Sequence, residues 1–305
     1  ALNFKENDLI IVPSFTFVAT ANVIEYIKAK PIFVDINIKT FNIDETIIED
    51  VIKKEKGVKG IIPVNLFGLC ANLPYILEIS KRYDIRVIED CACSFGSYIG
   101  NRHSGTFGEV GCFSFHPRKV ITTGEGGMIV TNDEKINDMV RILRDHGASK
   151  SDYLRHNSKA SFLMPEYNVL GYNYRMTDIQ GALGVSQLSK AEFILQKRKE
   201  IANKYYDFLK DFDFLVLPYI PENYVHSFQS FVCLYVGSKD NFEKLDKISL
   251  DKIEELSNKR DRFMLLLEEM GISTRQGTHA VHILGYYKKK YNLKPLDFRN
   301  SYIAD

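Results

Sequence analysis

Short apolar runs alternate with helical patterns through the first part of the chain, and this alternation constrains the fold most. The runs are rich in Ile and Val and cover Leu9–Val12, Pro31–Ile36, Gly60–Asn65, Ile85–Asp90, Cys112–Phe115 and Met128–Thr131. Between the first four, apolar residues recur at a spacing of three and four in Ala21–Ala29, Ile43–Lys54 and Leu73–Tyr83. The alternation predicts βαβ units, and therefore an α/β fold with a mostly parallel sheet buried on both faces.

The second half of the chain has a different pattern of predicted helices and strands. A helix is expected over Glu134–Arg144, and "YRMTDIQGALG" is expected to start one long helix, in which Thr177 and Gln180 form a capping box. After Phe214 a strand, "FQSFVCLYV", precedes the charged segment Lys239–Arg262, which is most simply a solvated helix or an insertion. We therefore expect a large domain over 1–214 and a smaller α+β domain over 215–305.

Composition excludes several classes of protein. A net charge of +1 argues against a nucleic-acid partner, and no apolar run is long enough to span a membrane. The five cysteines lack a disulfide-framework spacing, which indicates reduced thiols in the cytoplasm, and no metal site is expected from Cys91 and Cys93. The chain opens without Met and stops in a helix-like segment, so both ends are expected to be cuts through a longer protein.

Two side chains follow the ends of predicted strands. Asp90 closes the run "IRVIED", and Lys119 follows "GCFSF" and precedes a glycine-rich turn. Ligands of open α/β sheets bind beyond the carboxyl ends of the strands, although Asp90 could equally cap the next element and Lys119 could be a solvated surface residue. Ser114 lies before Lys119, and the glycines at 124, 126 and 127 follow it. An acid, a lysine and a phosphate cradle together are what pyridoxal phosphate requires.

Two other phosphate-binding patterns fit worse. The glycines come after the lysine, so there is no GxxxxGK[ST] motif. No GxGxxG lies between the first strand and the first helix, so the dinucleotide-binding fingerprint is missing as well.

Seven blocks, in order along the chain, resemble the DegT/DnrJ/EryC1/StrS family of sugar aminotransferases. They are "VPSFTFVATANVI" (12–24), "PIFVDINIKTFNID" (31–44), "IPVNLFG" (62–68), "VIEDCACSFGS" (87–97), "GCFSFHPRKVITTGEGGMIVTND" (111–133), "RDHG" (144–147) and "GYNYRMTDIQGALG" (171–184). The resemblance implies the aspartate-aminotransferase-like fold, type I, with pyridoxal 5'-phosphate as cofactor.

The resemblance also implies roles for single residues. Lys119 matches the lysine that forms a Schiff base with the cofactor and later moves the proton, and Asp90 matches the acid paired with the pyridine nitrogen. Ser114 matches a phosphate ligand, and Phe17 matches the aromatic residue that stacks on the cofactor ring. Asn173 matches a residue that reaches the phosphate of the neighbouring subunit, which implies a homodimer with shared active sites.

The remaining positions are assigned more loosely. Cys93 stands where many members have a glutamine, and we count it among the cofactor-binding positions. "GISTRQGTHAVH" (271–282) is similar to the segment near the sugar site, which places Arg275 and His282, together with His116, in the substrate pocket.

The resemblance implies an aminotransferase that moves an amino group, with glutamate as donor, onto a nucleotide-linked keto-deoxysugar in cell-surface polysaccharide or glycoside biosynthesis. One alternative is the dehydratase branch of the family, in which a histidine replaces the Schiff-base lysine. Lys119 counts against that branch. The other alternative is a non-catalytic relative that binds a sugar nucleotide. The sequence does not identify the sugar, the carbon that is aminated or the amino donor.

Overall fold

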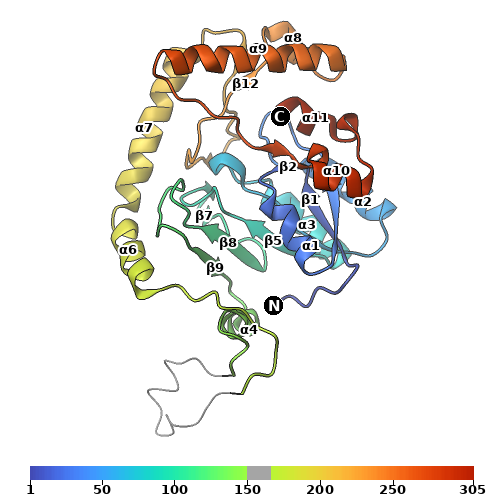
Figure 1. Cartoon of the computed structure of the whole chain (residues 1–305), viewed down its shortest axis with the longest axis vertical. Coiled ribbons are helices and arrows are strands. Elements are labelled where there is room, and N and C mark those ends of the chain that lie inside the picture. The colour runs from blue at the N-terminus through green and yellow to red at the C-terminus, as the bar shows by residue number, and fades with distance from the viewer. Residues whose placement is uncertain (150–165) are drawn as a thin grey trace.

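The computed structural model describes residues 1–149 and 166–305, and its centre is a six-stranded sheet (Figure 1). The strand order is β3-β1-β4-β5-β8-β9, and every neighbouring pair is parallel except β8 and β9. These strands are β1 (Leu9–Pro13), β3 (Lys30–Val34), β4 (Val58–Ile61), β5 (Arg86–Asp90), β8 (Val110–Ser114) and β9 (Gly127–Val130). The predicted mostly parallel sheet is therefore confirmed.

Helices cover both faces of the sheet, and β1 shows why. Side chains alternate along a strand, so Ile10 and Val12 share a cluster with α1 (Ala19–Tyr26) and α10 (Gly285–Tyr291). Ile11 belongs to the other cluster, with α2 (Ile48–Lys54) and α3 (Leu73–Tyr83). All three strand residues are at most 1% exposed. A strand buried on both faces must be apolar throughout, which is why its sequence reads as a continuous run.

The helices match the expected pattern closely in the first half and less well later. Helix α3 and helix α4 (Glu134–Arg144) have the predicted bounds. The single long helix expected from "YRMTDIQGALG" is wrong, because Ser189 and Lys190 separate α6 (Asp178–Leu188) from α7 (Ala191–Leu209). The capping box of Thr177 and Gln180 is present at the start of α6.

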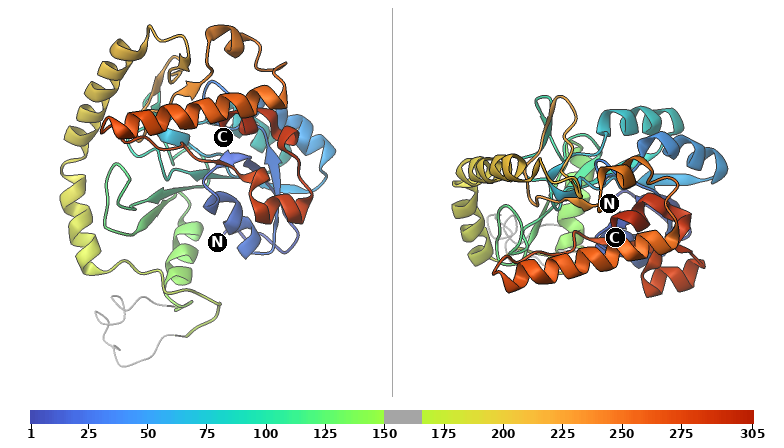
Figure 2. Two further views of the ribbon diagram at one scale, coloured as in Figure 1. Left: turned by 45° about the horizontal axis from the view of Figure 1, so that its top comes forward. Right: turned by 90° about the horizontal axis from the view of Figure 1, so that it is seen from above.

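The rest of the chain adds short strands and peripheral helices. Among the described residues, the remaining strands and α-helices are β2 (Phe15–Thr16), β6 (Tyr98–Ile99), β7 (Arg102–His103), β10 (Leu215–Val216), β11 (Tyr224–Val225), β12 (Leu234–Tyr235), β13 (His279–Ala280), α8 (Lys239–Glu243), α9 (Leu250–Glu269) and α11 (Arg299–Ala304). Figure 2 shows α9 as a long helix on the outside of the molecule. No helix within 1–149 and 166–305 is long and apolar enough to cross a membrane.

The last part of the chain returns to the first strands. Strand β13 pairs antiparallel with β2, and Ser14 Oγ lies 2.6 Å from His282 Nδ1. The Asp35 carboxylate accepts hydrogen bonds from the backbone N–H groups of Asn300 and Ser301, each at 2.8 Å. Residues beyond 279 thus pack on the segments around the first strands, while the division into two domains at 215 stays a prediction.

Candidate active site

The candidate site lies at the carboxyl edge of the sheet, where two neighbouring parallel strands end. Asp90 is the last residue of β5 and stands opposite Cys112 of β8, and Ser114 ends β8. Lys119 lies in the loop that joins β8 to β9. Strand polarity therefore brings a carboxylate, a hydroxyl and the loop bearing an amine to the same edge.

The Asp90 carboxylate is held by donors from two sides. Thr20, in the first turn of α1, donates its hydroxyl to Asp90 Oδ2 at 2.8 Å. The backbone N–H of Ala92 donates to Asp90 Oδ1 at 3.0 Å. Asp90 itself is partly exposed. Each carboxylate oxygen can accept further bonds, so Asp90 is fixed in position and still able to bind a ligand cation.

The Lys119 amine contacts the thiol of Cys93, with a distance of 3.3 Å from Nζ to Sγ. Burial raises the pKa of the Cys93 thiol, the nearby Lys119 charge opposes this shift, and the Asp90 carboxylate adds to it. The backbone N–H of Phe67 also points to the thiol. Asp90 and Lys119 therefore both lie close enough to Cys93 to shift the pKa of its thiol, and the thiol stays neutral at pH 7.

The loop that carries Lys119 is anchored by packing. Val120 and Ile121, directly after Lys119, are 5% and 3% exposed and pack against Ala191 at the start of α7. Gln229 Nε2 donates to the Arg118 carbonyl oxygen at 3.2 Å. These two buried neighbours and the contact to the backbone fix the position of the main chain around Lys119, and with it the direction in which the lysine side chain starts.

The glycine-rich turn keeps the end of this loop tight. A Cβ at Gly126 would lie 2.4 Å from Thr123 Oγ1, and its φ of +159° is one that other residues rarely adopt. Ser114 Oγ accepts the backbone N–H of His116 at 3.3 Å. Ser114 and the turn flank Lys119 along the chain, and a hydroxyl together with backbone N–H groups is able to bind an anion.

Phe17 is the predicted stacking residue, and its side chain is open to solvent. It lies between β2 and α1 and is 63% exposed, although its neighbours Phe15 and Thr16 are buried. A large exposed aromatic ring three residues from Thr20 is available to a planar ligand.

Among the described residues, no side-chain contact joins Lys119 to the other predicted residues, and His116 meets Lys119 only through its carbonyl oxygen, which accepts the Lys119 N–H at 2.9 Å. His116 is partly exposed, with Nε2 3.9 Å from Glu125 Oε1. Asn173 is exposed and bridges to Asp145 through the backbone, and Arg275 is exposed and donates to the Thr274 carbonyl oxygen. Their roles stay predictions.

His282 is the predicted substrate residue that fits its role least. It is 0% exposed, and both ring nitrogens lie within hydrogen-bonding distance of protein atoms, Nδ1 of Ser14 Oγ and Nε2 of the Pro295 carbonyl oxygen at 3.0 Å. Because Nε2 faces a carbonyl, it must donate, and Nδ1 accepts the serine proton. Burial lowers the pKa of the imidazole, so the neutral ring connects the residue directly after β1 to the last segment.

Two residues next to Asp90 were missed by the sequence argument. Glu89 is 0% exposed and accepts the backbone N–H groups of Gly105, Phe107 and Gly108 at 2.6 to 2.8 Å. Thr20 binds Asp90 from a segment 70 residues earlier. Neither contact has a local sequence signal, because each joins segments that meet only in the folded chain.

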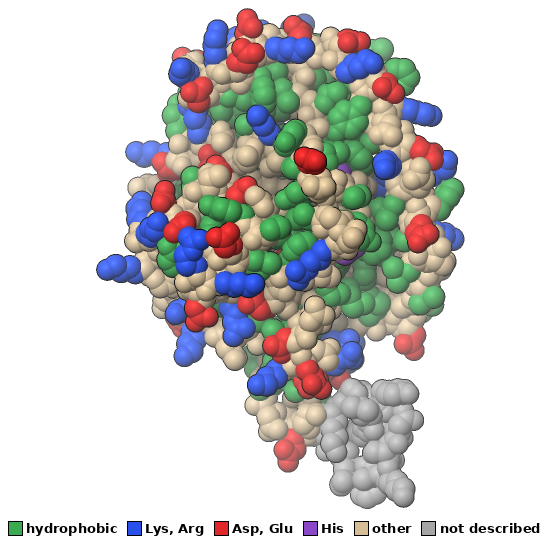
Figure 3. All heavy atoms as spheres, turned by 180° about the vertical axis from the view of Figure 1, so that it is seen from behind, with side chains coloured by type: hydrophobic (Ala, Val, Ile, Leu, Met, Phe, Trp, Pro, Cys, Tyr) green, Lys and Arg blue, Asp and Glu red, His purple; other side chains and the backbone are tan. Residues whose placement is uncertain are grey.

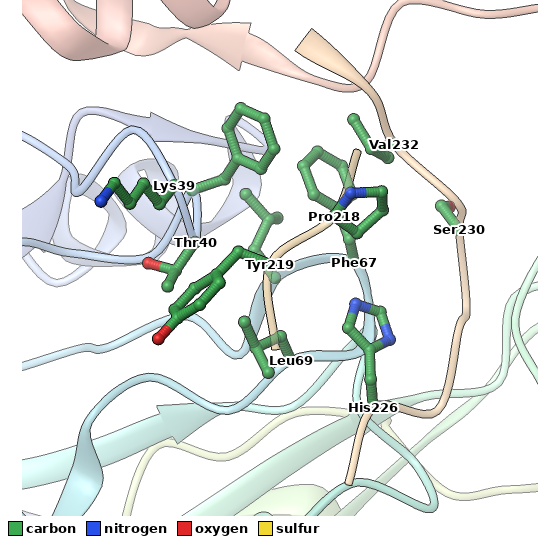
Figure 4. A pocket seen from close by; sticks show the side chains of 11 residues that line it. Lys39, Thr40, Phe67, Leu69, Pro218, Tyr219, His226, Ser230 and Val232 are labelled. Carbon is green, nitrogen blue, oxygen red and sulfur yellow. The ribbon is translucent and has the colours of Figure 1, made fainter. Parts of the chain in front are cut away.

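A small pocket lies beside this edge, and Figure 4 shows its lining. The residues are Lys39, Thr40, Phe41, Leu66, Phe67, Leu69, Pro218, Tyr219, His226, Ser230 and Val232. None of them was singled out from the sequence. His226 accepts the Phe228 N–H at Nδ1, 2.8 Å, and burial lowers the pKa of its imidazole to about 4.

The donor set at the edge fits pyridoxal phosphate. A carboxylate can pair with a protonated ring nitrogen, an amine can condense with an aldehyde, and a hydroxyl with glycine backbone can hold a phosphate. Asp90, Lys119 and Ser114 supply these groups, and Phe17 supplies an open aromatic face.

Comparison with known proteins supports this interpretation. The model of the DegT/DnrJ/EryC1/StrS aminotransferase family matches residues 1–304. An uncharacterized protein of Methanocaldococcus jannaschii, MJ1066, is 36% identical over 99% of this chain and 73% of its own length. GDP-perosamine synthase of Escherichia coli O157:H7 is 33% identical over 97% of this chain and 72% of its own length. The PMP-form structure of the putative sugar aminotransferase Spr1654 from Streptococcus pneumoniae has a TM-score of 0.85 and 25% identity, covering 99% of this chain and 76% of that chain.

Proposed function

This chain belongs to the DegT/DnrJ/EryC1/StrS aminotransferase family, a family of pyridoxal-phosphate-dependent sugar aminotransferases with the type I fold, and from that premise we propose its specific reaction. It transfers the amino group of glutamate to the keto carbon of a nucleotide-linked deoxysugar, in the biosynthesis of a cell-surface polysaccharide or glycoside. The name of the E. coli relative, the synthase of a GDP-linked sugar, supports this substrate class.

The contact of the Lys119 amine with Cys93 Sγ, three residues after Asp90, carries the proposal. Pyridoxal phosphate, when bound, supplies an aldehyde that condenses with amines and a ring that accepts electrons. In our proposal Asp90 keeps the ring nitrogen protonated, and Lys119 Nζ takes and returns the proton at the reacting carbon. Ser114 Oγ and the backbone of the turn at 124–127 hold the phosphate, and Phe17 stacks on the ring.

The proposed Lys119 role supports the transaminase reaction over the two alternatives. A histidine at this position would favour the dehydratase branch, whereas the chain has a lysine whose amine lies 3.3 Å from Cys93 Sγ. A non-catalytic relative needs no amine held in this way. His116 is anchored by Arg118 N–H at Nδ1, 3.2 Å, and lies outside that contact.

We also propose that the enzyme is a cytoplasmic homodimer in which Asn173 reaches the partner's phosphate. Helix α6 has no buried residue, and its large apolar side chains are open to solvent: Ile179, Val185 and Leu188 are 84%, 70% and 52% exposed. Figure 3 shows hydrophobic side chains reaching the surface among the charged ones. A second copy covering such a helix would remove this apolar surface from water. The five cysteines are free thiols, which suits a reducing compartment.

Borohydride trapping tests the central role of Lys119. Reduction of the full-length enzyme loaded with pyridoxal phosphate is expected to fix the cofactor on Lys119, which peptide mass spectrometry would identify. Lys119→Arg keeps the charge but has no amine that condenses with an aldehyde, so it is expected to lose the label and transamination. Lys135→Arg, on the exposed α4, is the matched control and should keep both.

Two outcomes would contradict the proposal. A label on another lysine would assign the amine elsewhere, and full transamination by Lys119→Arg would remove Lys119 from the reaction.

Assaying the wild-type enzyme with glutamate against a panel of nucleotide-linked keto sugars would identify the acceptor.

A further inference from the structure

A chain of two buried hydroxyl groups leads to the Asp90 carboxylate. Thr16, in β2, is 1% exposed, and Thr20, in α1, is 4% exposed. Thr16 Oγ1 lies 3.1 Å from Thr20 Oγ1, and Thr20 Oγ1 donates to Asp90 Oδ2 at 2.8 Å. A hydroxyl group can donate only one hydrogen bond. Because Thr20 donates to Asp90, it must accept the hydrogen bond that joins it to Thr16. The two bonds therefore run in one direction, toward the carboxylate.

Packing alone does not explain a threonine at position 20. Its neighbours in the helix, Ala21 and Ile24, are buried in an apolar cluster, where valine would have the same shape without a polar atom. A buried hydroxyl without a partner is costly. The Asp90 carboxylate removes that cost, and a bond to a charged acceptor is worth more than one between neutral groups.

From these contacts we infer that Thr20, supported by Thr16, is a positioning residue that fixes the Asp90 carboxylate for the cofactor nitrogen. The inference rests on the proposed function, because it assigns Thr20 a task in the same site. The Ala92 N–H holds Oδ1 and Thr20 holds Oδ2, so the plane of the carboxylate is set from both ends. Without Thr20 only one oxygen keeps a fixed donor, and the carboxylate can rotate away from the ring nitrogen.

The test compares Thr20→Val with Thr20→Ser in the full-length enzyme. Valine removes the hydroxyl and keeps the shape, and we expect the pyridoxal phosphate Kd, titrated into apo-enzyme, to rise about tenfold, the loss of one bond to a charged group. The kcat is expected to fall by about the same factor while the KM for the amino donor stays constant. Serine keeps the hydroxyl and should restore both values to within about twofold.

Thr131→Val is the matched control. Thr131 directly follows β9, at the end of the sheet opposite to Ser114, and its hydroxyl donates to the Glu109 carbonyl oxygen at 2.6 Å. The same substitution there removes a hydroxyl hydrogen bond away from the site and is expected to leave Kd and kcat unchanged. Thermal unfolding of each apo-protein shows whether a variant is folded. If Thr20→Val does not fold, Thr16→Val is tested instead. This variant removes only the hydrogen bond from Thr16 to Thr20 and should weaken cofactor binding by a smaller factor.

The outcomes separate this inference from the proposed function. If the wild-type enzyme binds pyridoxal phosphate and transaminates, but Thr20→Val does so with unchanged Kd and kcat, only the positioning role of Thr20 is overturned. If the wild-type enzyme binds no pyridoxal phosphate, the proposed function and this inference both fail. A loss in Thr131→Val equal to that in Thr20→Val would assign the effect to general stability and would also overturn the role.

Discussion

The carboxylate of Asp90 combines two properties that usually conflict, a fixed position and an open side. Thr20 and the Ala92 N–H occupy one lone pair on each oxygen, while the side chain stays partly exposed. A ligand cation can therefore approach a carboxylate that has already lost its rotational freedom. This arrangement lowers the entropic cost of binding.

We expect Asp90→Asn to separate cofactor binding from turnover. Asparagine keeps the shape and still accepts hydrogen bonds, but it is neutral and cannot hold a proton on the ring nitrogen, so kcat should fall about a hundredfold or more while pyridoxal phosphate still binds. Steady-state kinetics and an absorbance titration measure the two effects. Asp138→Asn, on α4, is the control, and near-normal turnover by Asp90→Asn would refute the assignment.

The sequence suggests candidate residues for the site but not the contacts that support them. Asp90, Ser114 and Lys119 could be proposed because each follows a recognisable strand, and the carboxyl ends of parallel strands share an edge. Thr20 could not, because its partner is 70 residues away. His282 was expected in the substrate pocket, but a histidine has the same local sequence whether its ring is buried or open, and only the fold places it between Ser14 and Pro295.

At the scale of elements, the apolar runs predicted the central strands because a strand buried on both faces leaves no room for polar residues. The joint between α6 and α7 was missed, since Ser189 and Lys190 carry neither the glycine nor the proline that usually ends a helix. Helix α6 instead stops where α7 turns to pack against the loop after Lys119, through Ala191. Tertiary contact decided this boundary.

The segment after β11 contains a residue, His226, that makes the stability of the fold depend on pH. Its pKa in the folded protein is lowered to about 4 by burial, from 6.5, so the unfolded state binds a proton first as the pH falls. Stability is therefore complete above pH 6.5 and is lost between about 6.5 and 4, by about 3 kcal/mol in total. Urea unfolding at pH 7.5 and 5 measures the loss.

His226→Asn is expected to reduce this loss, because asparagine does not titrate and its oxygen can still accept the Phe228 N–H. His279→Asn is the control, since the His279 side chain is 51% exposed. A pH dependence that is the same in His226→Asn as in the wild-type protein would show that another group is responsible.

At the scale of the whole molecule, we expect a homodimer whose interface includes α6. Val185→Lys would place a charge on an apolar surface that is 70% exposed in the single chain, so it should favour monomers if a partner covers that surface. Sedimentation velocity of the full-length protein measures the shift, with Asn258→Lys, which adds the same single positive charge on the exposed side of α9, as the control. An active wild-type monomer would remove the proposed role of Asn173.

The return of the last segment to the first strands has a consequence for how the protein is made. Ser14 meets His282 across 268 residues, and Asp35 meets Ser301 across 266. The ribosome adds about 5–20 residues per second, so β1 waits roughly 15 to 50 seconds for the partners that complete its cover. During that interval one face of an apolar strand lacks its final neighbours, and such long-range closure is slow. Synthesis on the ribosome is therefore the stage at which this apolar strand most needs the protection of chaperones.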